Sequence, residues 1–348
     1  MKIILNADTF KRFYTLRFHK IYSLPIAILM PHSRCNCRCV MCDIWKGNNN
    51  VQQLNEFDVE KLLASFRKLS TKLVVMSGGE ALMHPNFFKL CDIIKAQKIK
   101  ICILSTGLLL KKYANDIISK TDEVIVSLDG PREVHDKIRN IPNAFEKLKE
   151  GVQQLKKIDK KYRVTARCVI QRDNFRDLSN IVNAAHEIGL DQISFLTADV
   201  STDAFNRPEL WGEEKIGEVK LSREELEIFK DEIESLIKTH QVDFENKFIA
   251  ESPEKLRKFY KYYAAFHGLN EFPQINCNAP WVSAVIESDG TVRPCFFHAK
   301  VGNINEAAFD EIINSEKSIS FRKNLDVKTN PVCEKCVCSL NLSPLARP

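Results

Sequence analysis

The sequence of 348 residues lacks a long hydrophobic run, a strong net charge and any low-complexity segment. Its longest useful apolar stretch, "LPIAILM" at 24–30, is far shorter than the roughly 18 residues that span a bilayer, and it does not resemble the apolar core of a signal peptide. The net charge of +6 is spread along the chain, without the interleaved basic and aromatic residues typical of nucleic-acid binders. These absences predict a cytoplasmic protein with no nucleic-acid partner.

Cysteine, in contrast, is abundant and unevenly placed. Four cysteines fall within eight positions of "HSRCNCRCVMCDIW" (32–45), and five more follow residue 270. In a reducing compartment, clustered cysteines bind metals or perform redox chemistry more often than they form disulfides. The other three, Cys91, Cys102 and Cys168, lie in helix-like or strand-like segments, and we expect them to be small buried apolar residues.

Short apolar runs alternate with helix-period segments between residues 24 and 197. The runs occupy 24–30, 72–76, 100–104, 123–128, 164–170 and 192–196. Behind Asn55, a predicted N-cap, Val59, Leu62 and Phe66 recur at helical spacing. Because parallel strands need helical crossovers, six such repeats predict an α/β fold with a parallel sheet, either open or curled into a partial barrel. Ligands then lie at the carboxyl ends of the strands.

Four unusual stretches each follow a predicted strand, so one shared site accounts for them. They are the first cysteine cluster, "SGGE" (77–80), "STG" (105–107) and "LDGP" (128–131). Gly78 and Gly79 allow the backbone to approach a small ligand, and Glu80 offers acceptors to an ammonium group. The hydroxyls and carboxylate at the next strand ends are further candidates for binding ribose or carboxylate oxygens, or ordinary capping residues: Ser105, Thr106, Ser127 and Asp129.

Cys35, Cys39 and Cys42 have the spacing C-x3-C-x2-C. Three thiolates on one loop can hold three irons of a cubane and leave the fourth iron open to another ligand. The alternative is a zinc site that recruits His32 or Cys37 as its fourth ligand.

This pattern, with Met41 before the last cysteine and "GGE" after the second strand, resembles the radical S-adenosylmethionine (radical SAM) superfamily from residue 24 to about 197. The resemblance implies a partial (β/α)6 barrel and a [4Fe-4S] cluster on Cys35, Cys39 and Cys42, with Cys37 not a ligand. It further implies S-adenosylmethionine as cofactor, a 5′-deoxyadenosyl radical, and an electron donor such as flavodoxin or ferredoxin. The implied cofactor-binding residues are Gly78, Gly79, Glu80, Ser105, Thr106, Ser127 and Asp129.

The C-terminal cysteines resemble the auxiliary-cluster extension of this superfamily, called SPASM in its long form and twitch in its short form. Cys277 and Cys295 have the spacing C-x12-G-x4-C, and three further cysteines form C-x2-C-x-C. Five cysteines are too few for two clusters, so the resemblance implies one auxiliary [4Fe-4S] cluster on Cys277, Cys295, Cys333 and Cys336, with Cys338 as the competitor of Cys336. A zinc ribbon is the alternative.

These patterns predict four parts: an N-terminal extension (1–23), a radical SAM core (24–212), a helical connector (213–270) with solvated faces and a SPASM/twitch-like iron–sulfur domain (271–348). The aromatic and basic segment 9–22 is expected to pack across the domain, although it also suits an anionic membrane surface.

The resemblance implies an oxidoreductase or mutase that abstracts hydrogen from a small-molecule biosynthetic intermediate. A peptide-modifying SPASM enzyme and a non-catalytic zinc or iron–sulfur adaptor are the alternatives. Weaker candidates for substrate contact are Arg132, His135 and His298. We also expect Gly79→Val to weaken S-adenosylmethionine binding and leave the iron content nearly normal, because it blocks the approach of the backbone to the cofactor without touching a cluster ligand.

Overall fold

Six parallel strands form the centre of the computed structural model, which describes residues 7–207 and 209–346. Their order along the sheet is β6-β5-β4-β3-β2-β1, so each strand pairs with its neighbour in the chain. The strands are β1 (Ile26–Leu29), β2 (Leu73–Met76), β3 (Lys100–Ser105), β4 (Glu123–Ser127), β5 (Arg163–Ile170) and β6 (Gln192–Thr197). All six predicted strands are therefore confirmed. Residues 1–6 of the predicted N-terminal extension and 347–348 of the C-terminal part lie outside the described residues.

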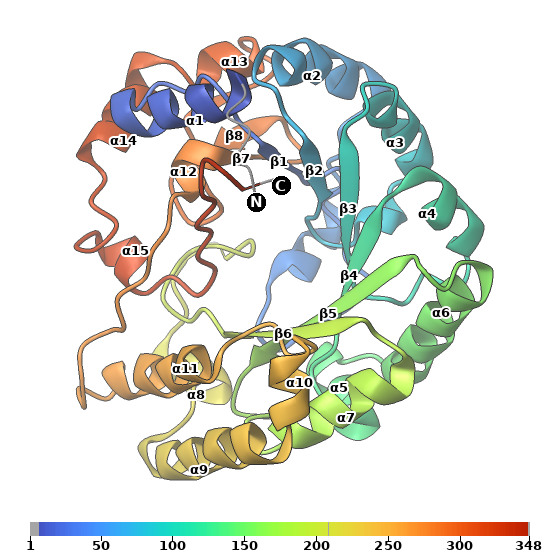
Figure 1. Ribbon diagram of the computed structural model, residues 1–348, viewed down its shortest axis with the longest axis vertical. Coiled ribbons are helices and arrows are strands. Elements are labelled where there is room, and N and C mark those ends of the chain that lie inside the picture. Colours follow the sequence, from blue (N-terminus) through green and yellow to red (C-terminus); the bar gives the residue numbers. More distant parts are fainter. Residues whose placement is uncertain (1–6, 208, 347–348) are drawn as a thin grey trace.

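Helices cover the outer face of this curved sheet, as Figure 1 shows for the right half of the molecule. They are α2 (Glu56–Lys68), α3 (Phe87–Lys95), α4 (Ala114–Lys120), α5 (Arg132–Arg139), α6 (Ala144–Ile158) and α7 (Leu178–Ile188). The start of α2 is fixed by a reciprocal capping box between Asn55 and Asp58, and Val59, Leu62 and Phe66 are buried as the spacing predicts. The α/β class and the partial barrel are thus confirmed.

The predicted connector forms four helices that close one side of the barrel. They are α8 (Glu213–Val219), α9 (Arg223–Thr239), α10 (Gln241–Glu245) and α11 (Pro253–Ala265). The hydroxyl of Tyr263 on α11 donates to the Ile170 carbonyl oxygen at 2.5 Å and accepts from the Ala198 amide at 3.0 Å. This side chain ties α11 to the ends of β5 and β6, so the connector packs on the barrel and is not only a solvated link.

The C-terminal region extends the same sheet beyond β1. Strand β7 (Ser283–Ile286) pairs in parallel with β1, and β8 (Thr291–Arg293) and β9 (Gly302–Asn303) continue in antiparallel fashion. The accompanying helices are α12 (Ala279–Val282), α13 (Phe309–Ile312), α14 (Glu316–Asn324) and α15 (Pro331–Glu334). The domain boundary at 271 stays a prediction, but the hydrogen-bonded sheet crosses it.

Helix α1 (Ala7–Phe18) packs against α12 through a polar face. Thr9, Arg12 and Thr15 are buried, whereas the aromatic side chains of the helix are exposed. The expected packing of this segment is therefore present, but its aromatic residues do not provide the contact. In the described part of the chain, no helix combines the length and the apolarity needed to span a bilayer.

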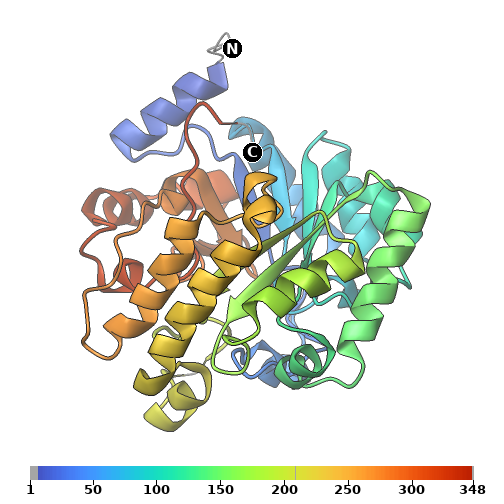
Figure 2. The same cartoon turned by 60° about the horizontal axis from the view of Figure 1, so that its bottom comes forward.

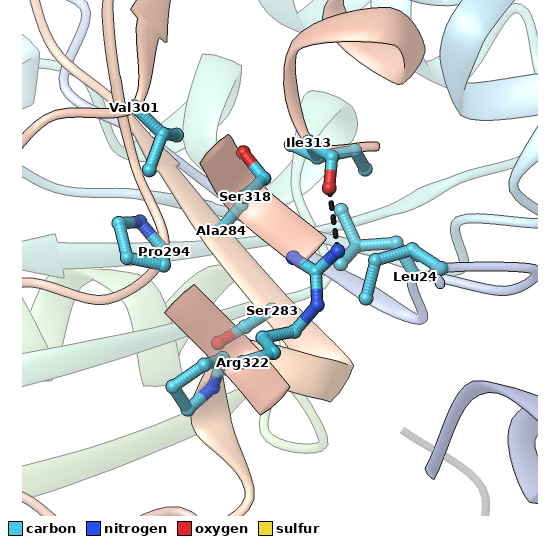
Figure 3. Close-up of a pocket in the computed structure, with 10 residues that line it drawn as sticks. Leu24, Ser283, Ala284, Pro294, Val301, Ile313, Ser318 and Arg322 are labelled. Carbon is cyan, nitrogen blue, oxygen red and sulfur yellow. Dashed lines mark hydrogen bonds between the residues drawn. The ribbon is translucent and has the colours of Figure 1, made fainter. Parts of the chain in front are cut away.

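Arg322 on α14 joins the N-terminal segment to the C-terminal region. Its side chain is 2% exposed, with Nε donating to the His19 carbonyl oxygen at 2.6 Å and Nη2 donating to the Ile313 carbonyl oxygen at 2.7 Å. The guanidinium lines a cavity of about 10 Å³ beside Leu24 and Ser283 (Figure 3). Burial lowers the pKa of Arg322 to about 10, so the group stays charged at neutral pH.

We expect Arg322→Met to lower the free energy of unfolding by about 3 kcal/mol, because two buried carbonyl groups lose a charged donor. Lys323→Met, an exposed position on the same helix, should change it by less than about 0.5 kcal/mol. Urea unfolding followed by circular dichroism measures both, and equal losses would contradict this role of Arg322.

Candidate cofactor site at the carboxyl ends of the strands

The first cysteine cluster lies on a loop that follows β1 and is tied to neighbouring segments. The Asn48 side chain clamps the backbone of Cys35, accepting from its amide and donating to its carbonyl oxygen, both at 2.9 Å. The amides of Arg38 and Val40 donate to carbonyl oxygens at the end of α5, at 3.1 and 3.2 Å. The loop is therefore held from two sides before any ligand binds.

The thiols of this loop influence one another. Burial raises the pKa of both Cys35 and Cys42 to about 12, and negative charge on Cys39 adds to each rise. A hydrogen bond from Cys37, together with the positive charge of Arg139, lowers the pKa of Cys39 to about 7. Because a metal cluster needs thiolates, its binding here must release protons from Cys35 and Cys42.

Arg139 at the end of α5 is a buried cation that contacts this loop. Its Nη1 donates to the Cys39 Sγ at 3.5 Å, and its guanidinium forms a buried ion pair with Asp129. Asp129 Oδ1 also accepts from the Val169 amide at 2.9 Å. Sequence reasoning missed Arg139, because nothing in "HDKIRN" separates this arginine from the exposed basic residues around it. Asp129, a predicted cofactor-binding residue, has these protein partners, and its ligand contact stays a prediction.

Glu80 joins the ends of β2 and β3. Its fully buried carboxylate accepts from the Thr106 amide and hydroxyl, both at 2.7 Å, from the Ser105 hydroxyl at 3.1 Å and from the Leu82 amide at 3.1 Å. Burial raises the pKa of Glu80. These donors occupy the acceptor positions of a carboxylate, so its side chain positions Ser105 and Thr106. A contact of Glu80 with a ligand ammonium stays a prediction.

The two glycines before Glu80 pack against the cysteine loop. Gly78 has φ +111°, a conformation that favours glycine. A Cβ at Gly79 would lie 2.2 Å from the Arg34 carbonyl oxygen, which also accepts from the Glu80 amide at 2.8 Å. Gly79 is thus required by the backbone that precedes Cys35. This geometry argues against the expectation that Gly79→Val leaves the cysteine loop undisturbed, and a contact of Gly79 with the cofactor stays a prediction.

Ser127 differs from the other predicted polar residues. It is half-buried at the end of β4 and has no side-chain hydrogen bond among the described residues. Ser105, Thr106, Glu80 and Asp129 all hydrogen-bond to protein groups. The structure brings this predicted set to one end of the sheet, and of the five polar side chains it leaves that of Ser127 free to bind a ligand.

The segment after β6 covers the far side of the cysteine loop. Arg207 forms a buried ion pair with Asp199 at 2.8 Å, and its guanidinium carbon lies 3.7 Å from the centroid of the Trp211 ring. Trp211 Nε1 donates to Asp43 Oδ2 at 2.9 Å, one residue after Cys42. Sequence reasoning missed these residues, because no spacing pattern links them to a loop more than 150 positions earlier.

The C-terminal cysteines form a second group. Burial raises the pKa of Cys295 to about 11 and of Cys333 to about 12, and negative charge on Cys277 adds to both. Burial also raises the pKa of Cys336, which interacts with Cys277, Cys295 and Cys338. His298, a candidate for substrate contact, instead has Nε2 3.3 Å from Cys333 Sγ. The other three cysteines are buried as predicted: Cys91, Cys102 and Cys168.

The two cysteine groups flank opposite ends of β1. The first follows the carboxyl end of the strand. Cys277 precedes β7, whose Ser283 pairs with Ile26 at the start of β1, and Cys295 follows β8, which runs back toward the same end. The four residues of β1, at about 3.3 Å each, span about 13 Å between these two ends.

A cavity of about 220 Å³ lies between α11 and the second cysteine group. Cys336 lines it, together with Thr197 at the end of β6 and the basic residues Lys255 and Lys258. Its lining residues include these two lysines and no Asp or Glu.

Both cysteine groups suit iron–sulfur clusters in their chemistry. No three described His, Cys, Asp or Glu side chains are arranged as ligands of a single metal ion. Two observations support iron–sulfur clusters. Three thiols lie on one loop that hydrogen bonds hold in place, and the C-terminal cysteines form a second group of thiols close enough to influence one another's pKa.

Comparison with known proteins matches both regions. The model of the radical SAM superfamily matches residues 29–198, and that of the SPASM iron–sulfur cluster-binding domain matches residues 277–337. The first includes the cysteine loop and the ends of β2, β3 and β4, and the second spans Cys277 to one residue beyond Cys336.

Two relatives and one solved structure place these matches in context. The chain is 24% identical over 307 residues to Fe-coproporphyrin III synthase of Methanosarcina barkeri, covering 83% of this chain and 73% of that protein. It is 23% identical over 304 residues to the antilisterial bacteriocin subtilosin biosynthesis protein AlbA of Bacillus subtilis, covering 81% and 58%. Streptococcus suis SuiB bound to precursor peptide SuiA has the same fold, with TM-score 0.65, 15% identity and coverage of 94% and 74%.

Gly79→Val should lower both the iron content and S-adenosylmethionine binding, because a β-branched side chain displaces the Arg34–Cys35 backbone. Gly217→Val is the matched control, since a Cβ at Gly217 meets nothing within 4 Å. Anaerobic reconstitution followed by iron and sulfide assays measures the effect. Normal iron in Gly79→Val with weakened cofactor binding would restore the ligand-only role.

Cys35→Ala, Cys39→Ala and Cys42→Ala should each abolish the cluster that cleaves S-adenosylmethionine, whereas Cys37→Ala should retain it. Cys37 and Cys39 are buried and Cys35 and Cys42 are half-buried, and Cys37→Ala removes a thiol from the same loop as the other three changes. The measurement is 5′-deoxyadenosine formation after reduction. Parental rates in any of the first three variants would refute the ligand assignment.

Proposed function

Because this chain belongs to the radical SAM superfamily and carries a SPASM-type C-terminal region, we propose that it removes a hydrogen atom from a small-molecule biosynthetic intermediate, which is then dehydrogenated or rearranged. Its cofactors are S-adenosylmethionine, a [4Fe-4S] cluster and an auxiliary [4Fe-4S] cluster. A flavodoxin or ferredoxin supplies the reducing electron in this proposal.

The observation that carries the proposal is the attachment of one cysteine loop to the carboxyl ends of the strands. Cys35, Cys39 and Cys42 would hold the first cluster, which with S-adenosylmethionine supplies a 5′-deoxyadenosyl radical able to attack an unactivated C–H bond. Arg139 beside Cys39 offsets negative charge in this buried place. The free Ser127 hydroxyl and the glycine backbone of 78–79 are available to polar groups of the bound cofactor.

The second cysteine group gives the enzyme a place for a surplus electron. Hydrogen-atom abstraction leaves a substrate radical in either case. Dehydrogenation then requires that radical to lose one proton to a base and one electron to an acceptor, whereas a rearrangement does not require the electron to leave. Cys277, Cys295, Cys333 and Cys336 would hold the auxiliary cluster, and Cys336 lines the 220 Å³ cavity. A substrate bound in or beside that cavity would contact this group directly.

The same cavity supports a small substrate. Its volume of about 220 Å³ is far above the roughly 10–15 Å³ that a single water needs, so it has room for a small organic molecule. Lys255 and Lys258, without a lining acid, favour a substrate that carries a carboxylate or phosphate.

A peptide substrate is the second candidate. The relative from Bacillus subtilis is named for bacteriocin biosynthesis, and the Streptococcus suis structure contains a precursor peptide. This chain spans 58% of the length of the former, so that protein's full activity does not transfer to it.

The test is anaerobic reconstitution. The proposal expects about eight irons and eight sulfides per chain, as two four-iron clusters require, and 5′-deoxyadenosine on reduction. Two zinc ions and no 5′-deoxyadenosine would overturn it in favour of an adaptor. Stimulation of 5′-deoxyadenosine formation by the small-molecule fraction of a cell extract, and not by its peptide fraction, separates the two substrate classes.

If the reaction is a dehydrogenation, the double variant Cys277→Ala, Cys295→Ala should still form 5′-deoxyadenosine and make no oxidised product. Cys102→Ala, a buried cysteine on β3 outside both groups, is the matched control and should retain both activities. Circular dichroism must first establish that the double variant is folded, because cluster loss can unfold its region. Full product formation by a folded double variant would exclude this electron route.

A further inference from the structure

Helix α1 buries polar side chains and exposes aromatic ones, the reverse of an ordinary surface helix. A surface helix ordinarily buries its apolar stripe and exposes its polar face. In α1 the buried residues are Thr9, Arg12 and Thr15. Its large aromatic side chains are instead about half exposed: Phe10 at 52%, Phe13 at 48%, Tyr14 at 54% and Phe18 at 49%. The outward face of this helix is therefore the apolar one.

Specific hydrogen bonds fix this orientation. Arg12 Nη1 donates to the carbonyl oxygens of Pro344 and Ala346 in the C-terminal segment. Thr15 Oγ1 accepts from the amides of Tyr22 and Ser23, at 2.9 and 3.4 Å. Rotating the helix to bury its aromatic face would break these bonds and expose the guanidinium of Arg12, which is now buried. Figure 2 shows α1 at the outer edge of the molecule, away from the barrel.

The exposed aromatic side chains form one surface, here called the aromatic patch: Phe10, Phe13, Tyr14, Phe18 and Tyr22. Within it, the Tyr14 ring stacks on Phe18 with centroids 5.7 Å apart and meets Tyr22 edge-on at 6.2 Å. Tyr22 is 40% exposed and extends the patch beyond the helix. The helix alone is about 18 Å long at 1.5 Å per residue.

Cations surround the aromatic patch. The guanidinium of Arg17 lies 5.8 Å from the Phe18 ring centroid, and the ammonium of Lys20 lies 6.0 Å from that of Tyr22. Neither cation has an ion-pair partner among the described residues, whereas the acidic residue of this helix, Asp8, pairs with Lys72 at 3.5 Å. The surface thus combines exposed aromatic rings with uncompensated positive charge.

We propose that α1 docks the protein on an anionic lipid surface, with the aromatic patch in the acyl–headgroup boundary and Arg17 and Lys20 at lipid phosphates. Exposed apolar patches of this kind mark interaction sites, and aromatic rings with flanking basic residues suit a membrane interface. A second copy of the chain fits less well. A two-fold contact through this patch would bring the cations of both copies together.

Sedimentation with vesicles tests the proposal on the full, reconstituted protein. Phosphatidylcholine vesicles with about one third phosphatidylglycerol should bind it, and pure phosphatidylcholine vesicles should bind it about tenfold more weakly. Raising the salt concentration should weaken binding to the anionic vesicles, because the charged contacts are exposed.

Two sets of variants make the test specific. Replacing Phe10, Phe13 and Phe18 by Gln should reduce vesicle binding at least about tenfold without changing 5′-deoxyadenosine formation. The matched control replaces three exposed apolar residues elsewhere by Gln, Phe57 (62%), Leu210 (63%) and Val242 (64%), and should bind vesicles normally. Arg17→Gln with Lys20→Gln should remove the preference for anionic vesicles.

Three results would overturn the proposal. They are no sedimentation with anionic vesicles, equal loss of binding in the control triple variant, and a dimer in light scattering that the α1 variants dissociate without any vesicle binding. The last result would assign the aromatic patch to self-association. None of these outcomes depends on the reaction that the protein catalyses, so the proposal stands or falls separately from the proposed function.

Discussion

The candidate site depends on the hydrogen bonds that the buried carboxylate of Glu80 accepts. An ionised carboxylate removed from water is costly unless donors surround it, and the ends of β2 and β3 supply those donors. The amide of the same residue binds the Arg34 carbonyl oxygen, directly before Cys35. One residue therefore fixes two strand ends and the start of the cysteine loop. Because the hydrogen bonds at both strand ends share one carboxylate, a displacement of the end of β2 or of β3 weakens the hydrogen bonds at the other strand end.

Charge balance supports the same loop from its other side. The ion pair of Arg139 with Asp129 brings a cation to Cys39 that remains charged at every physiological pH. Burial raises the pKa of Cys35 and Cys42, and negative charge on Cys39 raises both further, so neighbouring thiolates here repel one another. A fixed positive charge reduces that repulsion when all three thiols ionise. Asp129 in turn compensates the guanidinium and links it to β5 through the Val169 amide.

The continuous sheet relates the two cysteine groups. Because β7 pairs with β1 in register, the hairpin that precedes Cys295 cannot shift relative to the first strand without breaking the ladder. Parallel pairing of this kind holds the first strand of the C-terminal region in fixed register with β1. Arg322 adds a second constraint, since it joins α14 to the segment that leads into β1.

Local patterns in the sequence were sufficient for the six strands, the capping box at Asn55 and the two cysteine groups, because each depends on residues a few positions apart. They also placed the four unusual stretches at one end of the sheet, since parallel strands end at a common edge.

Tertiary structure alone decided the roles of Gly79, Arg139 and Arg207. Arg139 contacts a cysteine 100 positions away, and Arg207 contacts Met41 across 166 positions. It also decided which face of α1 is buried. The spacing of the aromatic residues defines a stripe, but the hydrogen bonds of Arg12 to the other end of the chain turn that stripe outward.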